Sequence, residues 1–130
     1  MSTKYRGSCL CGGVQFSVAG FSELAANCHC TMCRKFHGAA FATFGEAKAE
    51  NFIWLTGEQN LKTFTAENGT RRKFCQNCGS SMVFEASGET SNLVEFSLGT
   101  LDSDINEKPD VHIFTAYKAN WYEPGNDLPK

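Results

Sequence analysis

The stretch NCHCTMCRKFHG, residues 27–38, places three cysteines within six positions. The other four of the seven cysteines form two close pairs elsewhere in the chain. Clustered thiols of this kind are typical of metal or redox sites, and an odd number of cysteines argues against a simple set of disulfides. The three groups are Cys28, Cys30 and Cys33; Cys9 and Cys11; and Cys75 and Cys78.

Length and composition limit the function classes. The chain has 130 residues, enough for one domain spanning 1–130, with 42% hydrophobic and 20% charged residues. A formal net charge of -2 disfavours nucleic acid and anionic membranes as partners. The chain shows neither a secretory signal nor an apolar run of membrane-spanning length, so we expect a cytoplasmic protein. Oligomeric state is not indicated.

The hydrophobic pattern predicts a mainly β fold. Val14, Phe16 and Val18 alternate with polar residues after Gly12-Gly13, as in the second strand of a hairpin. Turn signals at Thr56-Gly57, Asn68-Gly69 and Ser87-Gly88 separate further short runs, which suggests mostly antiparallel sheets. Only Thr31–His37 has the composition of a short helix. The further strands are expected at 39–44, 51–55, 61–66, 70–75, 80–85, 93–98 and 111–117.

The spacing of the thiols fits tetrahedral zinc, which needs sulfurs about 3.8 Å apart. Cys75-Gln76-Asn77-Cys78-Gly79 has the form of a zinc knuckle, in which the glycine relieves crowding at the turn. In an extended Cys-x-Cys segment both sulfurs lie on one side. His29 would then point away, and we expect it to be a hydrogen-bonded histidine and not a ligand.

Two partitions of the seven thiols are compatible with the spacing. In the first, the two outer pairs make a four-sulfur site and Cys28, Cys30 and Cys33 make a three-sulfur site. In the second, Cys30 and Cys33 join the knuckle cysteines, and the remaining three thiols bind no metal. The first is favoured because it leaves no cysteine unassigned, although spacing alone does not exclude the second.

The chain resembles the glutathione-dependent formaldehyde-activating enzyme family, together with the centromere protein V-like zinc proteins. The resemblance is carried by Cys-x-Cys, then Cys-His-Cys-x-x-Cys-Arg-Lys, then Phe-Cys-x-x-Cys-Gly, and it runs almost end to end. Towards the C-terminus it continues through His112-Ile113-Phe114, Lys118-Ala119-x-Trp121 and Asp127-x-Pro129. It implies a β-tent fold of antiparallel sheets with zinc knuckles and two Zn²⁺ ions per chain. By position it implies a structural zinc on Cys9, Cys11, Cys75 and Cys78, and a catalytic zinc on Cys28, Cys30 and Cys33.

The two zinc sites are expected to differ in chemistry. A closed four-thiolate shell has no position for substrate and would lock the N-terminal hairpin to the knuckle. Three thiolates around Zn²⁺ carry a formal charge of -1 and leave one coordination position, which suits a soft sulfur ligand. A thiol bound there would be held as a nucleophilic thiolate.

The resemblance implies a zinc-dependent carbon–sulfur lyase that condenses a small thiol such as glutathione with a small aldehyde, formaldehyde. A zinc enzyme using another thiol or electrophile is a second hypothesis. The alternative from a different class is a non-catalytic, zinc-stabilised protein-interaction module. A nucleic-acid-binding zinc ribbon is disfavoured by the acidic balance.

The residue that stabilises the developing oxyanion is not fixed by the sequence. Arg34, Lys35 and His37 are the nearest candidates along the chain. The run Arg71-Arg72-Lys73 is expected to be a solvated strand face. His112 and Trp121 are assigned no catalytic role. Phenylalanines at strand-like spacing are expected in the core: Phe41, Phe44, Phe84, Phe96 and Phe114.

Overall fold

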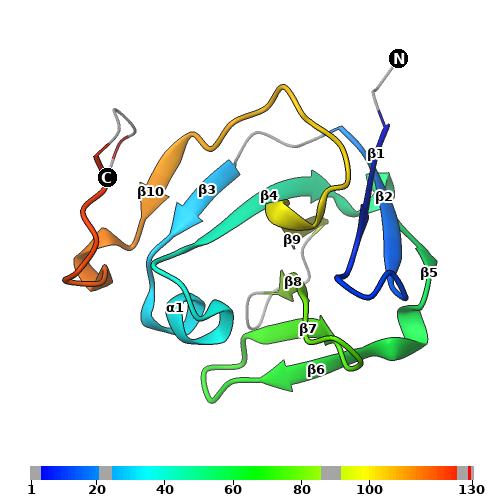
Figure 1. The fold of residues 1–130 in the computed structure, drawn as a ribbon, viewed down its shortest axis with the longest axis horizontal. Coiled ribbons are helices and arrows are strands. Elements are labelled where there is room, and N and C mark those ends of the chain that lie inside the picture. The colour runs from blue at the N-terminus through cyan, green and yellow to red at the C-terminus, as the bar shows by residue number, and fades with distance from the viewer. Residues whose placement is uncertain (1–3, 21–24, 86–91, 126–128, 130) are drawn as a thin grey trace.

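The computed structural model describes residues 4–20, 25–85, 92–125 and 129. Within these residues the chain forms two β-sheets and one short α-helix, so the expected mainly β fold is confirmed (Figure 1). The strands are β1 (Lys4–Ser8), β2 (Gln15–Ala19), β3 (Ala25–Cys28), β4 (Ala42–Lys48), β5 (Phe52–Thr56), β6 (Leu61–Thr65), β7 (Arg71–Cys75), β8 (Ser81–Glu85), β9 (Leu93–Ser97) and β10 (Val111–Ile113).

The first sheet has the order β1-β2-β5 and the second has the order β10-β3-β4-β9-β8-β7-β6. Every pairing is antiparallel except that of β10 with β3, which is parallel. Figure 1 shows the three-stranded sheet at one side of the molecule and β10 at the opposite side. The predominance of antiparallel pairs agrees with the prediction, and the parallel pair was not predicted.

The main hydrophobic core joins the two sheets. Val14, Phe16 and Val18 are fully buried, as the alternation after Gly12-Gly13 predicts. The Phe16 ring stacks on Phe52 with centroids 4.8 Å apart and meets Phe96 of the larger sheet at 5.9 Å. The apolar face of the hairpin therefore packs against the larger sheet.

The α-helix α1 (Thr31–His37) coincides with the predicted helical turn. It begins after Cys30, whose sulfur accepts a hydrogen bond from the Cys33 amide, and it ends at Gly38 in the left-handed region with φ 61°. The Gly38 amide donates to the Arg34 carbonyl, which closes the C-terminus in the manner of a helix cap. Four 3₁₀ helices complete the described elements: η1 (Ala49–Asn51), η2 (Glu58–Asn60), η3 (Leu98–Thr100) and η4 (Thr115–Tyr117).

Some predicted strand positions were wrong. The strand expected at 39–44 starts only at Ala42, because the chain must first turn out of α1, with the Ala39 amide still bonded to Arg34. The strand expected at 111–117 stops at Ile113, because Phe114 has φ 56° and η4 follows. The turn expected at Ser87-Gly88 and the motif residue Asp127 lie outside the described residues.

Candidate metal centres and the adjoining cavity

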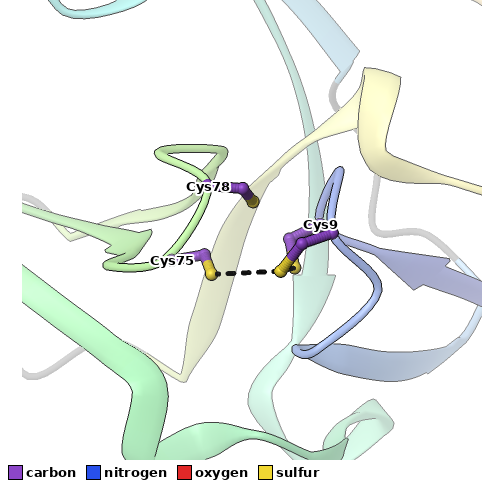
Figure 2. Close-up of side chains that lie close together, drawn as sticks. Cys9, Cys75 and Cys78 are labelled. Atoms are coloured by element: carbon purple, nitrogen blue, oxygen red, sulfur yellow. Dashed lines mark hydrogen bonds between the residues drawn. The ribbon is translucent and has the colours of Figure 1, made fainter.

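A four-cysteine cluster joins two turns that are distant in sequence. Cys9 and Cys11 lie on the turn between β1 and β2, while Cys75 and Cys78 lie at the end of β7 and in the turn after it. The four sulfurs all lie within 4.8 Å of one another. Figure 2 shows Cys9 facing Cys75 and Cys78 across the gap between these turns. The cluster therefore connects the three-stranded sheet to the seven-stranded sheet.

Both turns have backbone bonds that hold the sulfurs in place. In the knuckle, the Gly79 amide donates to the Cys75 carbonyl at 2.7 Å, and Gly79 has φ 82°. In the hairpin turn, the Cys9 amide donates to the Val14 carbonyl at 3.0 Å, and the Val14 amide donates to the Cys9 sulfur at 3.2 Å. Cys9 and Cys11 are thus brought together by a turn, and the extended geometry expected for this pair was wrong.

The three-cysteine cluster is built at the junction of β3 and α1. Cys28 ends β3, Cys30 caps α1, and Cys33 lies in the first helical turn. The sulfurs of Cys28 and Cys33 are 3.3 Å apart, and all three lie within 4.8 Å of one another. Among the described residues no fourth His, Cys, Asp or Glu belongs to this group.

The structure groups the seven sulfurs as four and three, and it does not bring Cys30 and Cys33 to the knuckle cysteines. All seven are free thiols. The sulfur–sulfur separations of 3.5 Å for Cys9–Cys11 and 3.9 Å for Cys11–Cys75 lie close to the roughly 3.8 Å needed around tetrahedral zinc. Both clusters therefore fit the ion in donor type and spacing, and both could hold zinc.

Two of the three thiols in the smaller cluster, those of Cys28 and Cys33, differ in acidity. The pKa of Cys33 is lowered to about 6, first by its hydrogen bond with Cys28 and further by Cys30 and the guanidinium of Arg72. The pKa of Cys28 is raised by the hydrogen bond with Cys33 and by burial. Cys33 is therefore the thiol of this pair that takes the negative charge.

A cavity of about 610 Å³ adjoins the three-cysteine cluster. Cys28, Cys30 and Cys33 form part of its wall. Among the described lining residues, the charged side chains are those of Arg72 and Glu95. Thr31, Asn68 and Thr70 add uncharged polar side chains to a wall that is otherwise mostly apolar, a combination common in small-molecule sites. The apolar part of the wall comes from Met32, Phe44, Phe84, Ile113, Phe114 and Tyr117.

Arg72 is the principal site residue that the sequence analysis misplaced. It is only 3% exposed, so the expectation of a solvated face is wrong for this residue. Its guanidinium lies 5.4 Å from the Phe36 ring centroid and 5.1 Å from that of Phe84. One nitrogen, Nη2, donates to the Cys33 sulfur at 3.5 Å. The expected solvated face describes its neighbours Arg71 and Lys73 better, because both form partly exposed ion pairs.

Glu95 was also missed. It lies on β9 directly opposite Glu46 of β4, and it lines the cavity. Burial raises the pKa of this carboxyl to about 7, with further contributions from the charges of Glu46 and Cys33. This glutamate lies in Leu93–Ser97, where its polar side chain follows the apolar Val94 and precedes Phe96. The sequence shows no local signal that a polar position of this strand faces a cavity.

None of the three predicted oxyanion donors lines this cavity. Arg34 donates from Nη1 to the Tyr117 carbonyl at 2.9 Å, and Lys35 is exposed. His37 lies 3.5 Å from the Ser81 hydroxyl in a separate groove of about 410 Å³. Burial lowers the pKa of His37 to about 4, assisted by the charge of Arg72.

The remaining histidine near the cysteines points away from the metal cluster, as strand alternation predicts. His29 is fully buried, and its Nε2 lies 2.9 Å from Nδ1 of His112. The Phe41 ring packs against both imidazoles. Trp121 is 67% exposed.

The phenylalanine prediction holds in part. Phe96 is fully buried in the main core, and Phe44 is buried beside the three-cysteine cluster. Phe44 and Phe84 nevertheless line the cavity, and Phe114 is 57% exposed at its rim, so the core assignment is wrong for Phe114. The left-handed backbone at Phe114 turns the chain out of β10 and thereby exposes this ring.

Comparison with known proteins identifies a family and solved structures of similar fold. The family model described as glutathione-dependent formaldehyde-activating enzyme matches residues 4–117. The crystal structure of a Rhodobacter sphaeroides protein resembles this one with a TM-score of 0.65 at 20% identity, over 78% of this chain and 91% of that chain. That likeness supports the fold alone. No curated protein matches the chain. No helix in the described part of the chain is long and apolar enough to cross a membrane.

Proposed function

The chain belongs to the glutathione-dependent formaldehyde-activating enzyme family, and we propose that it is a zinc-dependent enzyme that makes or breaks a carbon–sulfur bond between a thiol and an aldehyde. The observation that carries the proposal is the position of the three-cysteine cluster in the wall of the 610 Å³ cavity. The family name points to glutathione as the thiol and to formaldehyde as the aldehyde.

The two clusters have separate roles in this proposal. Cys9, Cys11, Cys75 and Cys78 hold a structural zinc that joins the two sheets. Cys28, Cys30 and Cys33 hold the catalytic zinc, which supplies a coordination position where a thiol binds as its thiolate. The donor sets support this division, because four thiolates complete a tetrahedral shell and three do not.

The chain's own residues would prepare the cavity for this reaction. The thiol sulfur bonds to the carbonyl carbon, the carbonyl π electrons move to the oxygen, and the oxygen takes up a proton that balances the one lost by the thiol. Glu95 is the proposed proton carrier, because its pKa of about 7 makes both of its protonation states accessible near neutral pH.

We place the protein in the cytoplasm in this proposal. Seven free thiols, four of them buried, persist most readily in a reducing compartment. The substrate thiol would also be kept reduced there. A disulfide-forming compartment would compete with metal binding at both clusters.

X-ray absorption at the zinc edge tests the site. The expected result for protein holding two zinc ions is fewer than four sulfurs per zinc on average, rising toward four when a thiol is added. Four sulfurs around each zinc before any thiol is added would instead favour the non-catalytic interaction module.

The activity is tested by NMR, which follows exchange between formaldehyde and S-(hydroxymethyl)glutathione with and without protein. We expect the zinc-loaded wild type to accelerate the exchange and the Cys30→Ser variant not to do so. A zinc-loaded wild type that leaves the spontaneous rate unchanged with glutathione, and with a panel of smaller thiols, would overturn the proposal.

A further inference from the structure

A buried cation without an acidic partner lies in the wall of the cavity. Arg72 is 3% exposed, and among the described residues no carboxylate forms an ion pair with it. Burying an unpaired charge is costly, so a cation retained in this position requires negative charge nearby. The side chain is held in place by the rings of Phe36 and Phe84, which it contacts through cation–π interactions.

The two terminal nitrogens of this guanidinium have different surroundings. Nη2 donates to the Cys33 sulfur at 3.5 Å. A negative charge on that sulfur would offset part of the positive charge of the guanidinium. Nη1 is buried and makes no hydrogen bond with the rest of the described structure. An unsatisfied buried N–H costs about 1–3 kcal/mol, and more for a charged group. Arg72 lines the cavity, so it borders the space that a ligand would enter.

We propose that Arg72 is a catalytic residue whose guanidinium donates a hydrogen bond to the aldehyde oxygen as negative charge develops on it. This inference rests on the proposed function. The oxygen of the adduct is bonded to the same carbon as the sulfur, so the donor must lie beside the sulfur site. Arg72 meets this condition through its contact with Cys33, whereas Arg34, Lys35 and His37 do not line the cavity.

The aromatic packing makes Arg72 a preorganised donor. A guanidinium held between two rings does not need to reorient when the oxyanion forms, and such fixed donors stabilise transition states more than ground states. In the addition direction the oxygen gains the carbonyl π electrons and then a proton. In the reverse direction the O–H proton leaves first, and the oxygen electrons re-form the carbonyl as the carbon–sulfur bond breaks. Arg72 stabilises the same oxygen in both directions and is not itself deprotonated.

The kinetic test uses Arg72→Lys and Arg72→Gln, with Arg71→Gln on the exposed side of the same strand as the control. Loss of one oxyanion donor costs about 10²–10³ in kcat. We therefore expect kcat to fall by about that factor in Arg72→Gln and by less in Arg72→Lys, while KM changes less than about threefold. A rise in KM with unchanged kcat would overturn the inference, because it would make Arg72 an anchor for a substrate carboxylate.

A binding test examines the role of Arg72 without measuring catalytic activity. Thioacetate carries sulfur and oxygen on one carbon, as the adduct does, whereas ethanethiol has no oxygen. In protein loaded with Co²⁺, the sulfur-to-metal absorption band reports binding of either probe. Arg72→Gln is expected to weaken thioacetate binding at least about tenfold, the equivalent of one charge-assisted hydrogen bond. Ethanethiol binding is expected to change less than about threefold.

If neither Arg72 variant holds two metal ions, a measurement on the wild type alone tests the hydrogen bond from Arg72. The carbonyl stretch of bound thioacetate, measured against a small cobalt thioacetate complex, should shift to lower wavenumber when Arg72 donates to the oxygen. An unshifted stretch would overturn the role of Arg72 but not the proposed function. Equal weakening of thioacetate and ethanethiol binding in a metal-loaded variant would do the same. A wild type that binds neither probe overturns the proposed function and, with it, this inference.

Discussion

Replacing Cys75 with serine tests whether the four-cysteine cluster holds the two sheets together. Cys75 is fully buried, and its sulfur lies 3.9 Å from that of Cys11 on the other sheet's hairpin turn. Structural zinc contributes about 10–16 kcal/mol in apparent binding free energy, so one of four ligands corresponds to about 2.5–4 kcal/mol. A buried hydroxyl without a partner adds about 1–3 kcal/mol.

The combined loss of about 3.5–7 kcal/mol is comparable to the whole net stability of an ordinary domain, about 5–15 kcal/mol. We therefore expect Cys75→Ser to be largely unfolded at 25 °C, or to unfold at a much lower urea concentration than the wild type. Circular dichroism during urea titration measures this, and a colorimetric chelator assay measures the zinc content. Removing zinc from the wild type with a chelator should also lower its urea midpoint.

Cys30→Ser is the matched control, because it makes the same chemical change in the other cluster. Serine is a good N-cap, so the hydrogen bond from the Cys33 amide can be kept and α1 should persist. We expect this variant to lose one zinc and to keep its urea midpoint near that of the wild type. A Cys75→Ser protein with two zinc ions and the wild-type midpoint, or a Cys30→Ser protein that unfolds globally, would refute the division of roles.

Three further changes test other parts of the structure. Gly57→Ala should destabilise the fold by more than about 2 kcal/mol, because Gly57 has φ 81° and an added Cβ would lie 1.9 Å from the Gly13 carbonyl oxygen; Gly99→Ala, which meets no atom within 4 Å, is the control in urea titrations. Glu95→Gln should flatten the pH dependence of stability: the folded pKa of about 7 exceeds the ordinary 4.5, so the wild type loses stability as pH rises from about 4.5 to about 7. A wild-type-minus-variant difference that stays constant over this range would contradict that expectation. Arg71→Ala should change the unfolding free energy by less than about 1 kcal/mol, since its ion pair is solvent-exposed.

The metal clusters and the hairpin could be predicted because their signals are local. Cysteines two or three residues apart can share an ion whatever the distant fold, and Val14, Phe16 and Val18 alternate because one face of β2 is buried and the other is not. Strand β3 gave no such signal. Its residues Ala25–Cys28 are all buried, since neighbouring elements cover both faces, and a strand of this kind loses the alternation that marks it in sequence.

Arg72 shows where sequence reasoning stopped short. Side chains alternate between the two faces of a strand, so three consecutive basic residues on β7 cannot all occupy one solvated face. Alternation therefore required Arg72 to point away from Arg71 and Lys73. The residues that Arg72 contacts on that other face depend on long-range packing. This packing brings Phe36 from α1, Phe84 from β8 and Cys33 to one guanidinium. Three thiolates and one Zn²⁺ would carry a net charge of -1 there, so a single arginine would neutralise the cluster and could remain buried beside it.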